Sequence, residues 1–368
     1  MKRLRLALWP ALVALVLFGT AAAAQANGHH KGKHHGHHGH HGRFVVVGPG
    51  DSIQAAVDAA KPGTTIVVKG THSENVAITK DGISLIGFHA VLQPAATPTQ
   101  NACFDPSQPG DVNGICVLGD VNFDTGTVNR EVKNVTIKGF TIRGFSDSGI
   151  IAFGAHKATF AGNVAEDNDE YGITAFASTG TTIAFNRVSD AGEAGLYIGD
   201  SPKAHARVFR NEASNNLFGI LIRNAEHGKV FGNSFHNNCV GAVVLADAPG
   251  PAGFFRFTGN RVRHNTKACA VSEDLDIPLS GIGIALSGAT NVSIKGNLIT
   301  DNVPSGETAL SGGVVVASGD GGTAPTNNRV VKNVILRNQP DLFWDGTGTG
   351  NVFRRNACQT STPPGLCS

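Results

Sequence analysis

Beyond its first 26 residues, the sequence has no long apolar run and few charges. Lys, Arg, Asp and Glu make up 16% of the 368 residues, and the formal net charge is +2. No later segment is long and apolar enough to cross a bilayer, so we expect no membrane partner. No basic stripe is visible in the remainder either, which argues against nucleic acid as a partner.

Residues 1–26 have the pattern of a secretory signal. Three basic residues precede an apolar run from Leu6 to Phe18, and Ala24-Gln25-Ala26 offers a small-residue cleavage site. The run is short for a membrane anchor, and no cysteine follows it to carry a lipid. We therefore expect a secreted, extracellular protein, soluble and monomeric.

The chain has six cysteines, which in an exported protein predict disulfides. The sequence does not determine the connectivity. Pairing of sequence neighbours would give Cys103–Cys116, Cys239–Cys269 and Cys358–Cys367. We expect these bonds to staple loops.

Residues 27–43 form a tract of Gly, Lys and His that has nothing to bury and should be disordered. Three interpretations remain open: loose capture of Zn²⁺ or Cu²⁺, a pH-dependent contact with anionic cell-wall polymers, and a spacer without function. The histidines that would bind the metal are His29, His30, His34, His35, His37, His38, His40 and His41.

One short sequence motif recurs from about residue 135 to residue 356. It contains two asparagines five residues apart, each preceded and followed by apolar residues, and then a Gly with an apolar triplet such as Gly219-Ile-Leu-Ile. Asn186 keeps the first position, whereas Ala191 replaces the second. The complete pairs are Asn163/Asn168, Asn211/Asn216, Asn233/Asn238, Asn260/Asn265, Asn297/Asn302 and Asn333/Asn338.

The recurrence predicts a stacked array of coils. The first asparagines follow one another at steps of 22 to 37 residues, and most steps are too short for a pair of helices. Apolar residues alternate around each asparagine, which is a strand pattern. Strands of successive coils would lie about 4.8 Å apart, so the asparagines could bond amide to amide up the stack. This is a parallel β-solenoid.

This recurring motif resembles the repeat of the right-handed parallel β-helix proteins of the pectin-lyase-like superfamily. The resemblance implies an all-β, single-stranded right-handed parallel β-helix with a short N-terminal capping helix, which we expect over Ser52–Ala60 with Asp51 as its cap. That fold carries lyases, hydrolases, epimerases, tailspikes and non-enzymes, so it leaves activity open. We expect the β-helix domain to span 44–368, with the N-terminal cap and first coils at 44–92, an excursion loop at 93–127, regular coils at 128–356 and a C-terminal cap at 357–368.

The register predicts that acidic residues crowd one edge of three consecutive coils. Such an edge could form an oxygen cage for Ca²⁺. A reaction similar to that of pectate lyases would need this calcium and a basic side chain, for which Arg143 and Arg187 are the candidates. The alternative is a solvated turn edge, because Asp is favoured at turns. The acids are Asp147, Asp167, Asp169, Glu170, Asp190 and Glu193.

The outward positions of the Gly-apolar strands are themselves apolar. Tyr171, Phe176 and Tyr197 on this face could be stacking platforms for sugar rings. Alternatively a loop, such as 93–127, covers the face, since large exposed apolar patches are rare without a partner.

Signatures of known enzymes are incomplete. The acidic residues of the polygalacturonase motifs are absent throughout the chain. The segment Tyr171-Gly-Ile-Thr-Ala-Phe resembles the mannuronan epimerase motif but lacks its acidic residue and its histidine. The β-helix proteins that help to assemble copper sites also share the repeat. We expect a protein that binds an extracellular polysaccharide and leave open its cleavage by β-elimination. The alternative is a non-catalytic extracellular, cell-wall or metal-binding protein.

Overall fold

The computed structural model describes residues 43–104, 111–122, 127–247, 250–272 and 275–367. The expected signal and the eight histidines of the tract lie outside the described residues. In the part that is described, no helix has the length and apolar character needed to span a bilayer.

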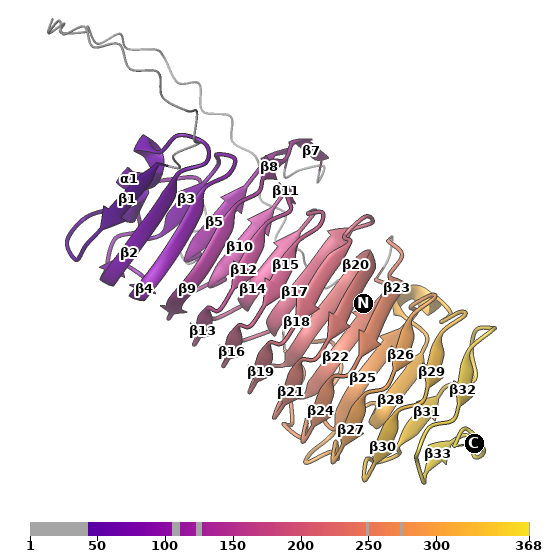
Figure 1. Cartoon of the computed structure of the whole chain (residues 1–368). Coiled ribbons are helices and arrows are strands. Elements are labelled where there is room, and N and C mark those ends of the chain that lie inside the picture. Colours follow the sequence, from indigo (N-terminus) through magenta and orange to yellow (C-terminus); the bar gives the residue numbers. More distant parts are fainter. Residues whose placement is uncertain (1–42, 105–110, 123–126, 248–249, 273–274, 368) are drawn as a thin grey trace, which may run out of the picture.

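The described chain winds into a long stack of parallel strands (Figure 1). A typical coil contains β12 (Thr159–Ala161), β13 (Val164–Glu166) and β14 (Tyr171–Phe176). Each strand pairs in parallel with its equivalents one coil before and one coil after, as β12 does with β9 and β15. The predicted all-β, single-stranded parallel β-helix is confirmed.

Two sheets run along the whole stack. Sheet A contains the strands on either side of the first asparagine, and sheet B contains the Gly-apolar strands. The strands of sheet A are β1 (Phe44–Val47), β2 (Thr65–Ser73), β4 (Ser84–Gln93), β9 (Thr136–Arg143), β12, β13, β15 (Thr182–Ala184), β16 (Arg187–Ser189), β18 (Ala206–Phe209), β19 (Glu212–Ser214), the second half of β20 (Phe218–Phe231), β21 (Ser234–His236), β23 (Gly253–Thr258), β24 (Arg261–Arg263), β26 (Ser293–Lys295), β27 (Leu298–Thr300), β29 (Arg329–Val331), β30 (Val334–Leu336) and β32 (Val352–Arg354).

Sheet B lies on another side of the coil and shares β20, whose first half belongs to it. Two short pairs stand apart from both sheets: β6 (Asp120–Asn122) with β7 (Thr127–Arg130), and β8 (Val132–Lys133) with β11 (Ala155–His156). A 3₁₀ turn spans Asp320–Gly322. The other strands of sheet B are β3 (Val76–Ile78), β5 (Ile115–Leu118), β10 (Ile150–Phe153), β14, β17 (Ala194–Ser201), β22 (Val240–Leu245), β25 (Ile282–Ser287), β28 (Gly312–Ala317), β31 (Leu342–Trp344) and β33 (Ser361–Thr362).

The asparagine ladders form as predicted. Asn186 donates from Nδ2 to Oδ1 of Asn211 at 2.9 Å, and Asn211 donates in turn to Asn233 at 3.0 Å. The first ladder continues in this way to Asn356, and the second runs from Asn216 to Asn338. These side chains are buried, so the ladder satisfies polar groups that would otherwise be unpaired in the core.

A short helix covers the N-terminal end of the stack (Figure 1). The helix α1 spans Ile53–Ala59, and its cap is Ser52 instead of the expected Asp51. The carboxylate of Glu74 also accepts hydrogen bonds from the backbone N–H groups of Ile53 and Gln54. The expectation about Asp51 was wrong because its side chain accepts from Gly48 outside the helix.

The region expected to be an excursion loop contains part of the core. Strand β5 (Ile115–Leu118) pairs with β3 and β10 in sheet B, so this part of the segment belongs to the stack. The three disulfides predicted from sequence neighbours are all present: Cys103–Cys116, Cys239–Cys269 and Cys358–Cys367.

Candidate functional site

The acidic residues lie above one another in successive coils, as predicted, but they do not form a calcium site. The backbone N–H of Glu170 donates to Asp147 O at 3.3 Å, and that of Glu193 donates to Glu170 O at 2.9 Å. The side chain of Asp147 accepts from Asn113 and Ser148, each at 2.8 Å, and buried Glu193 accepts from the Tyr171 hydroxyl.

The remaining acids occupy turns. Asp167 and Asp190 have φ values of 54° and 59°, and both are exposed, as is Asp169. Within the described part of the chain, no group of three or more His, Cys, Asp or Glu side chains could hold a metal ion. The Ca²⁺ expectation therefore has no support in the described residues, because these acids bond to neighbouring side chains or face solvent at corners that favour Asp.

Arg143 and Arg187 lie in different grooves on sheet A. Arg143 lies 3.8 Å from Glu166 and lines a groove of about 290 Å³ with Gln93, Gly144 and Asp167. Arg187 lies two coils later and lines a larger groove. The two candidates therefore do not share one reaction site.

Tyr171 and Tyr197 are not available as stacking platforms. They are 8% and 1% exposed and belong to one packed cluster with Leu275 and Leu279, from the loop held by Cys269. Burial, aided by the nearby charge of Glu193, raises the pKa of Tyr171 well above its usual value. Burial raises that of Tyr197 as well.

The apolar face of sheet B is therefore covered in its central part by a loop other than the one expected. From the described part of 93–127, Cys103 packs over the first coils against Cys116 of β5, Ile151 and Phe153. Phe176 stays partly exposed and stacks on Phe153 with ring centroids 5.9 Å apart.

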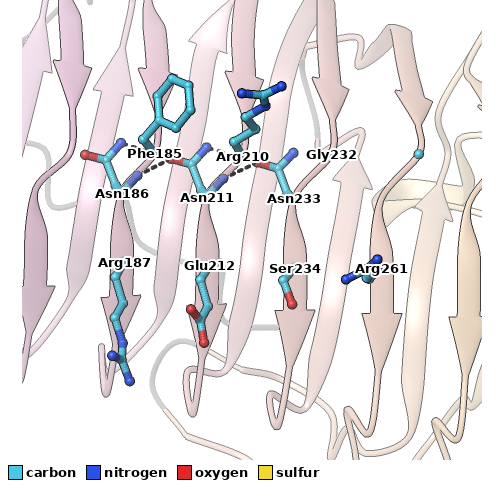
Figure 2. Close-up of a pocket in the computed structure, with 11 residues that line it drawn as sticks. Phe185, Asn186, Arg187, Arg210, Asn211, Glu212, Gly232, Asn233, Ser234 and Arg261 are labelled. Atoms are coloured by element: carbon cyan, nitrogen blue, oxygen red, sulfur yellow. Dashed lines mark hydrogen bonds between the residues drawn. The ribbon is translucent and has the colours of Figure 1, made fainter.

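A groove of about 500 Å³ lies on sheet A at the bend that carries the first asparagine ladder (Figure 2). Phe185 and Arg210 rise on one side of the ladder, and Arg187, Glu212 and Ser234 extend on the other. Arg261 closes one end.

Two glycines leave the groove open. Gly232 and Gly259 occupy the turn position that Phe185 and Arg210 hold in earlier coils, with φ values of 66° and 64°. A Cβ would meet nothing within 4 Å at Gly259 and only a side-chain carbon at 3.8 Å at Gly232. Phe185 and Arg210 have φ values of 58° and 54°, so larger side chains are accommodated at this turn.

Aromatic rings continue from the groove along the outer face of sheet A. Phe185 and Phe209 meet edge to face at 5.4 Å, and Phe209 stacks on Phe231 at 4.8 Å. The guanidinium of Arg210 lies over Phe185 at 5.5 Å, and that of Arg207 over Phe209 at 5.9 Å. The groove thus combines exposed cations with aromatic surface.

The register of the strands also aligns basic residues from successive coils in one row across sheet A. We call this row the basic file. Arg207 pairs with Lys229 in the neighbouring strand, and Lys229 pairs with Arg256. The file continues through Ser293 to Arg329. The inference that the folded part has no basic stripe was wrong, because these residues become neighbours only when the coils stack.

A sequence signal for this file was present. Each member stands four residues before a first asparagine, namely Asn211, Asn233, Asn260, Asn297 and Asn333. The same register that aligned the acids would therefore have aligned the basic residues.

Comparison with known families identifies the repeat. Residues 62–246 match the model of the family described as "Periplasmic copper-binding protein (NosD)". Residues 178–335 match "Right handed beta helix region". No curated protein sequence matches the chain.

Solved structures share the fold at low sequence identity. The A-module of mannuronan C-5 epimerase AlgE4 from Azotobacter vinelandii has a TM-score of 0.54 and 17% identity over 84% of this chain and 88% of its own. DFA-IIIase from Arthrobacter chlorophenolicus A6, without its lid, scores 0.58 at 12% identity over 85% and 94%. The periplasmic alginate epimerase AlgG scores 0.52 at 15% identity over 86% and 84%.

Proposed function

This chain belongs to the NosD family of right-handed parallel β-helix proteins, and we propose that it is an exported protein that binds a polysaccharide in the sheet A groove. The open groove with its aromatic and basic walls is the observation that carries the proposal. Several proteins of similar fold are named for action on polysaccharides, such as AlgE4 and AlgG. Three disulfides support export, because such bonds persist in oxidising compartments.

The side chains of the groove support binding better than cleavage by β-elimination. Arg187 is exposed, and a guanidinium stays protonated in proteins, so it can donate hydrogen bonds to a sugar but is poorly suited to accept a proton. Glu212 is the only carboxylate among the groove-lining residues. Its Oε1 lies 3.0 Å from Nε2 of His236.

Filling the groove tests the proposal. The full chain is measured by calorimetry against polygalacturonate, alginate and chondroitin, with ultraviolet absorbance used to monitor unsaturated chain ends. We expect at least one polymer to bind, without unsaturated ends. Gly259→Phe should weaken binding at least tenfold, because a ring would occupy the open position and the turn already tolerates Phe185.

Gly162→Phe is the matched control. Gly162 occupies the same turn with φ 63°, its Cβ would also meet nothing within 4 Å, and it does not line the groove. Equal affinity of Gly259→Phe and the unmodified chain would contradict the proposed site, and appearance of unsaturated ends would establish a lyase.

The family description favours copper binding as a second candidate function. Among the described residues the chemistry does not fit a copper centre, because all their cysteines form disulfides and no cluster of potential ligands occurs. The candidate ligands are instead the histidines of the tract 27–43. Titration of Cu²⁺ into the full chain, and into a variant with the eight histidines changed to serine, tests this. Equal uptake by both would contradict the tract as the site.

A further inference from the structure

The outer face of sheet A carries many more basic than acidic side chains, although the chain as a whole is nearly neutral, with a formal net charge of +2. Beside the file formed by Arg207, Lys229, Arg256 and Arg329, the exposed basic residues Arg261, Arg263 and Lys295 project from the adjacent strands β24 and β26.

Two acids on this face, Asp301 and Glu212, already have partners. Asp301 accepts two hydrogen bonds from Arg337, at 2.6 and 2.8 Å, and this pairing lowers the pKa of Asp301. Glu212 contacts His236 at 3.0 Å. No carboxylate of the described residues lies within 4.0 Å of the charged groups of Arg207, Lys229 or Arg256.

The file has a stability cost. Like charges directly opposite each other on neighbouring strands destabilise a sheet, and strands of the stack lie about 4.8 Å apart. Arg207, Lys229 and Arg256 are in direct register, and none of them forms an ion pair with a described carboxylate, so like charges face one another along the file. An anionic ligand laid along the file would offset this repulsion.

Aromatic rows flank the file on both sides. Phe209 and Phe231 stack on the side of the groove. On the other side His205 stacks on His227 at 5.2 Å, and His227 stacks on Phe254 at 4.8 Å. A ligand along the file would therefore meet charge at its centre and ring surface at its edges.

We propose that sheet A binds an acidic polysaccharide, with carboxylate or sulfate groups along the Arg207–Lys229–Arg256–Arg329 file and sugar rings against the flanking aromatics. This rests on the polysaccharide function proposed above and assigns its chemical class. The file extends over four strand spacings, about 19 Å, so the ligand is a polymer instead of a single sugar. An exported, disulfide-bonded protein meets acidic glycans, which favours them over nucleic acid.

The test uses dextran sulfate and polygalacturonate, with unmodified dextran as the neutral polymer and single-stranded poly(dT) as the nucleic acid. Affinities of the full chain are measured between 50 and 200 mM salt. We expect both acidic glycans to bind, with affinity falling steeply as salt rises, and free galacturonate not to compete.

Charge reversal locates the site. Lys229→Glu with Arg256→Glu should weaken dextran sulfate binding at least tenfold and flatten the salt dependence by about one unit of slope per residue. The matched control is Lys61→Glu with Arg43→Glu, which makes the same charge change at exposed positions near the N-terminal end. Circular dichroism of both double variants verifies that they fold.

The outcomes separate the two proposals. If dextran binds as tightly as dextran sulfate without salt dependence, the acidic class is overturned and polysaccharide binding stands. If neither dextran, the acidic glycans nor the polymers of the groove test bind, both proposals fail. Equal losses in the two double variants overturn the file as the site, and tighter binding of poly(dT) than of either acidic glycan overturns the choice of partner.

Discussion

At the residue scale, Asn233 shows how the repeat holds the coils together. Its Nδ2 donates to Val208 O and to Asn260 Oδ1, and its Oδ1 accepts from the backbone N and the Nδ2 of Asn211, all within 3.0 Å. Asn233→Ala would leave these buried partners unsatisfied, and we expect a loss of at least about 3 kcal/mol in the free energy of unfolding.

Urea denaturation measures this loss. Ser234→Ala is the control, because Ser234 faces the groove on the next residue and a surface change of this kind is worth about 0.5 kcal/mol or less. Similar losses in the two variants would show that the ladder contributes little to stability.

A substitution at Lys229 should change the stability of the free protein and its affinity for the ligand in opposite directions. Lys229→Gln removes the repulsion from Arg207 and Arg256, so the free energy of unfolding should rise by up to about 1 kcal/mol. The gain should shrink at high salt because ions screen the repulsion. Dextran sulfate binding should weaken in the same variant.

Denaturation and calorimetry on one preparation check both effects, with Lys61→Gln as the control. A merely structural lysine would not move stability and affinity in opposite directions. Loss of stability in Lys229→Gln would contradict the account of the file.

At the element scale, the sequence predicted the repeating elements and missed what covers them. The alternation around each asparagine predicted the strands, and neighbouring cysteines suggested the disulfides. The cover over Tyr197 comes from Leu275 and Leu279, in a loop without repeat, and no periodicity reports where such a loop folds back. The cap of α1 was misplaced because Glu74, from outside the helix, supplies part of its capping.

The covered tyrosines give a pH prediction. The chain has two tyrosines, and burial raises the pKa of each above the usual value of about 10. Because the folded values exceed the unfolded ones, this contribution to stability is complete below about pH 10 and is lost as the pH rises further.

Absorbance of the phenolate, followed together with circular dichroism, checks this. Neither tyrosine should ionise near pH 10 in the folded protein, and both should ionise together when it unfolds. Reversible ionisation of one tyrosine near pH 10 with an unchanged fold would contradict the cover over sheet B.

At the scale of the whole molecule, stacking of the coils brings basic residues together on one face of sheet A. Arg207, Lys229 and Arg256 are separated by 22 and 27 residues, and Arg329 by a further 73, because the later coils carry loops of different lengths. Composition and net charge average over such a pattern, so they predict no basic face. The asparagine register does contain it, since every member of the file has the same offset from its ladder residue.

Footprinting of arginines tests the central claim most directly. The full chain is treated with phenylglyoxal with and without bound dextran sulfate, and modification is read by mass spectrometry at each exposed arginine. We predict protection of Arg207, Arg256 and Arg329, with Arg43 and Arg130 reacting equally in both samples. Protection of Arg43 and Arg130 to the same extent, or unprotected file residues while the polymer is bound, would contradict the assignment of sheet A as the binding face.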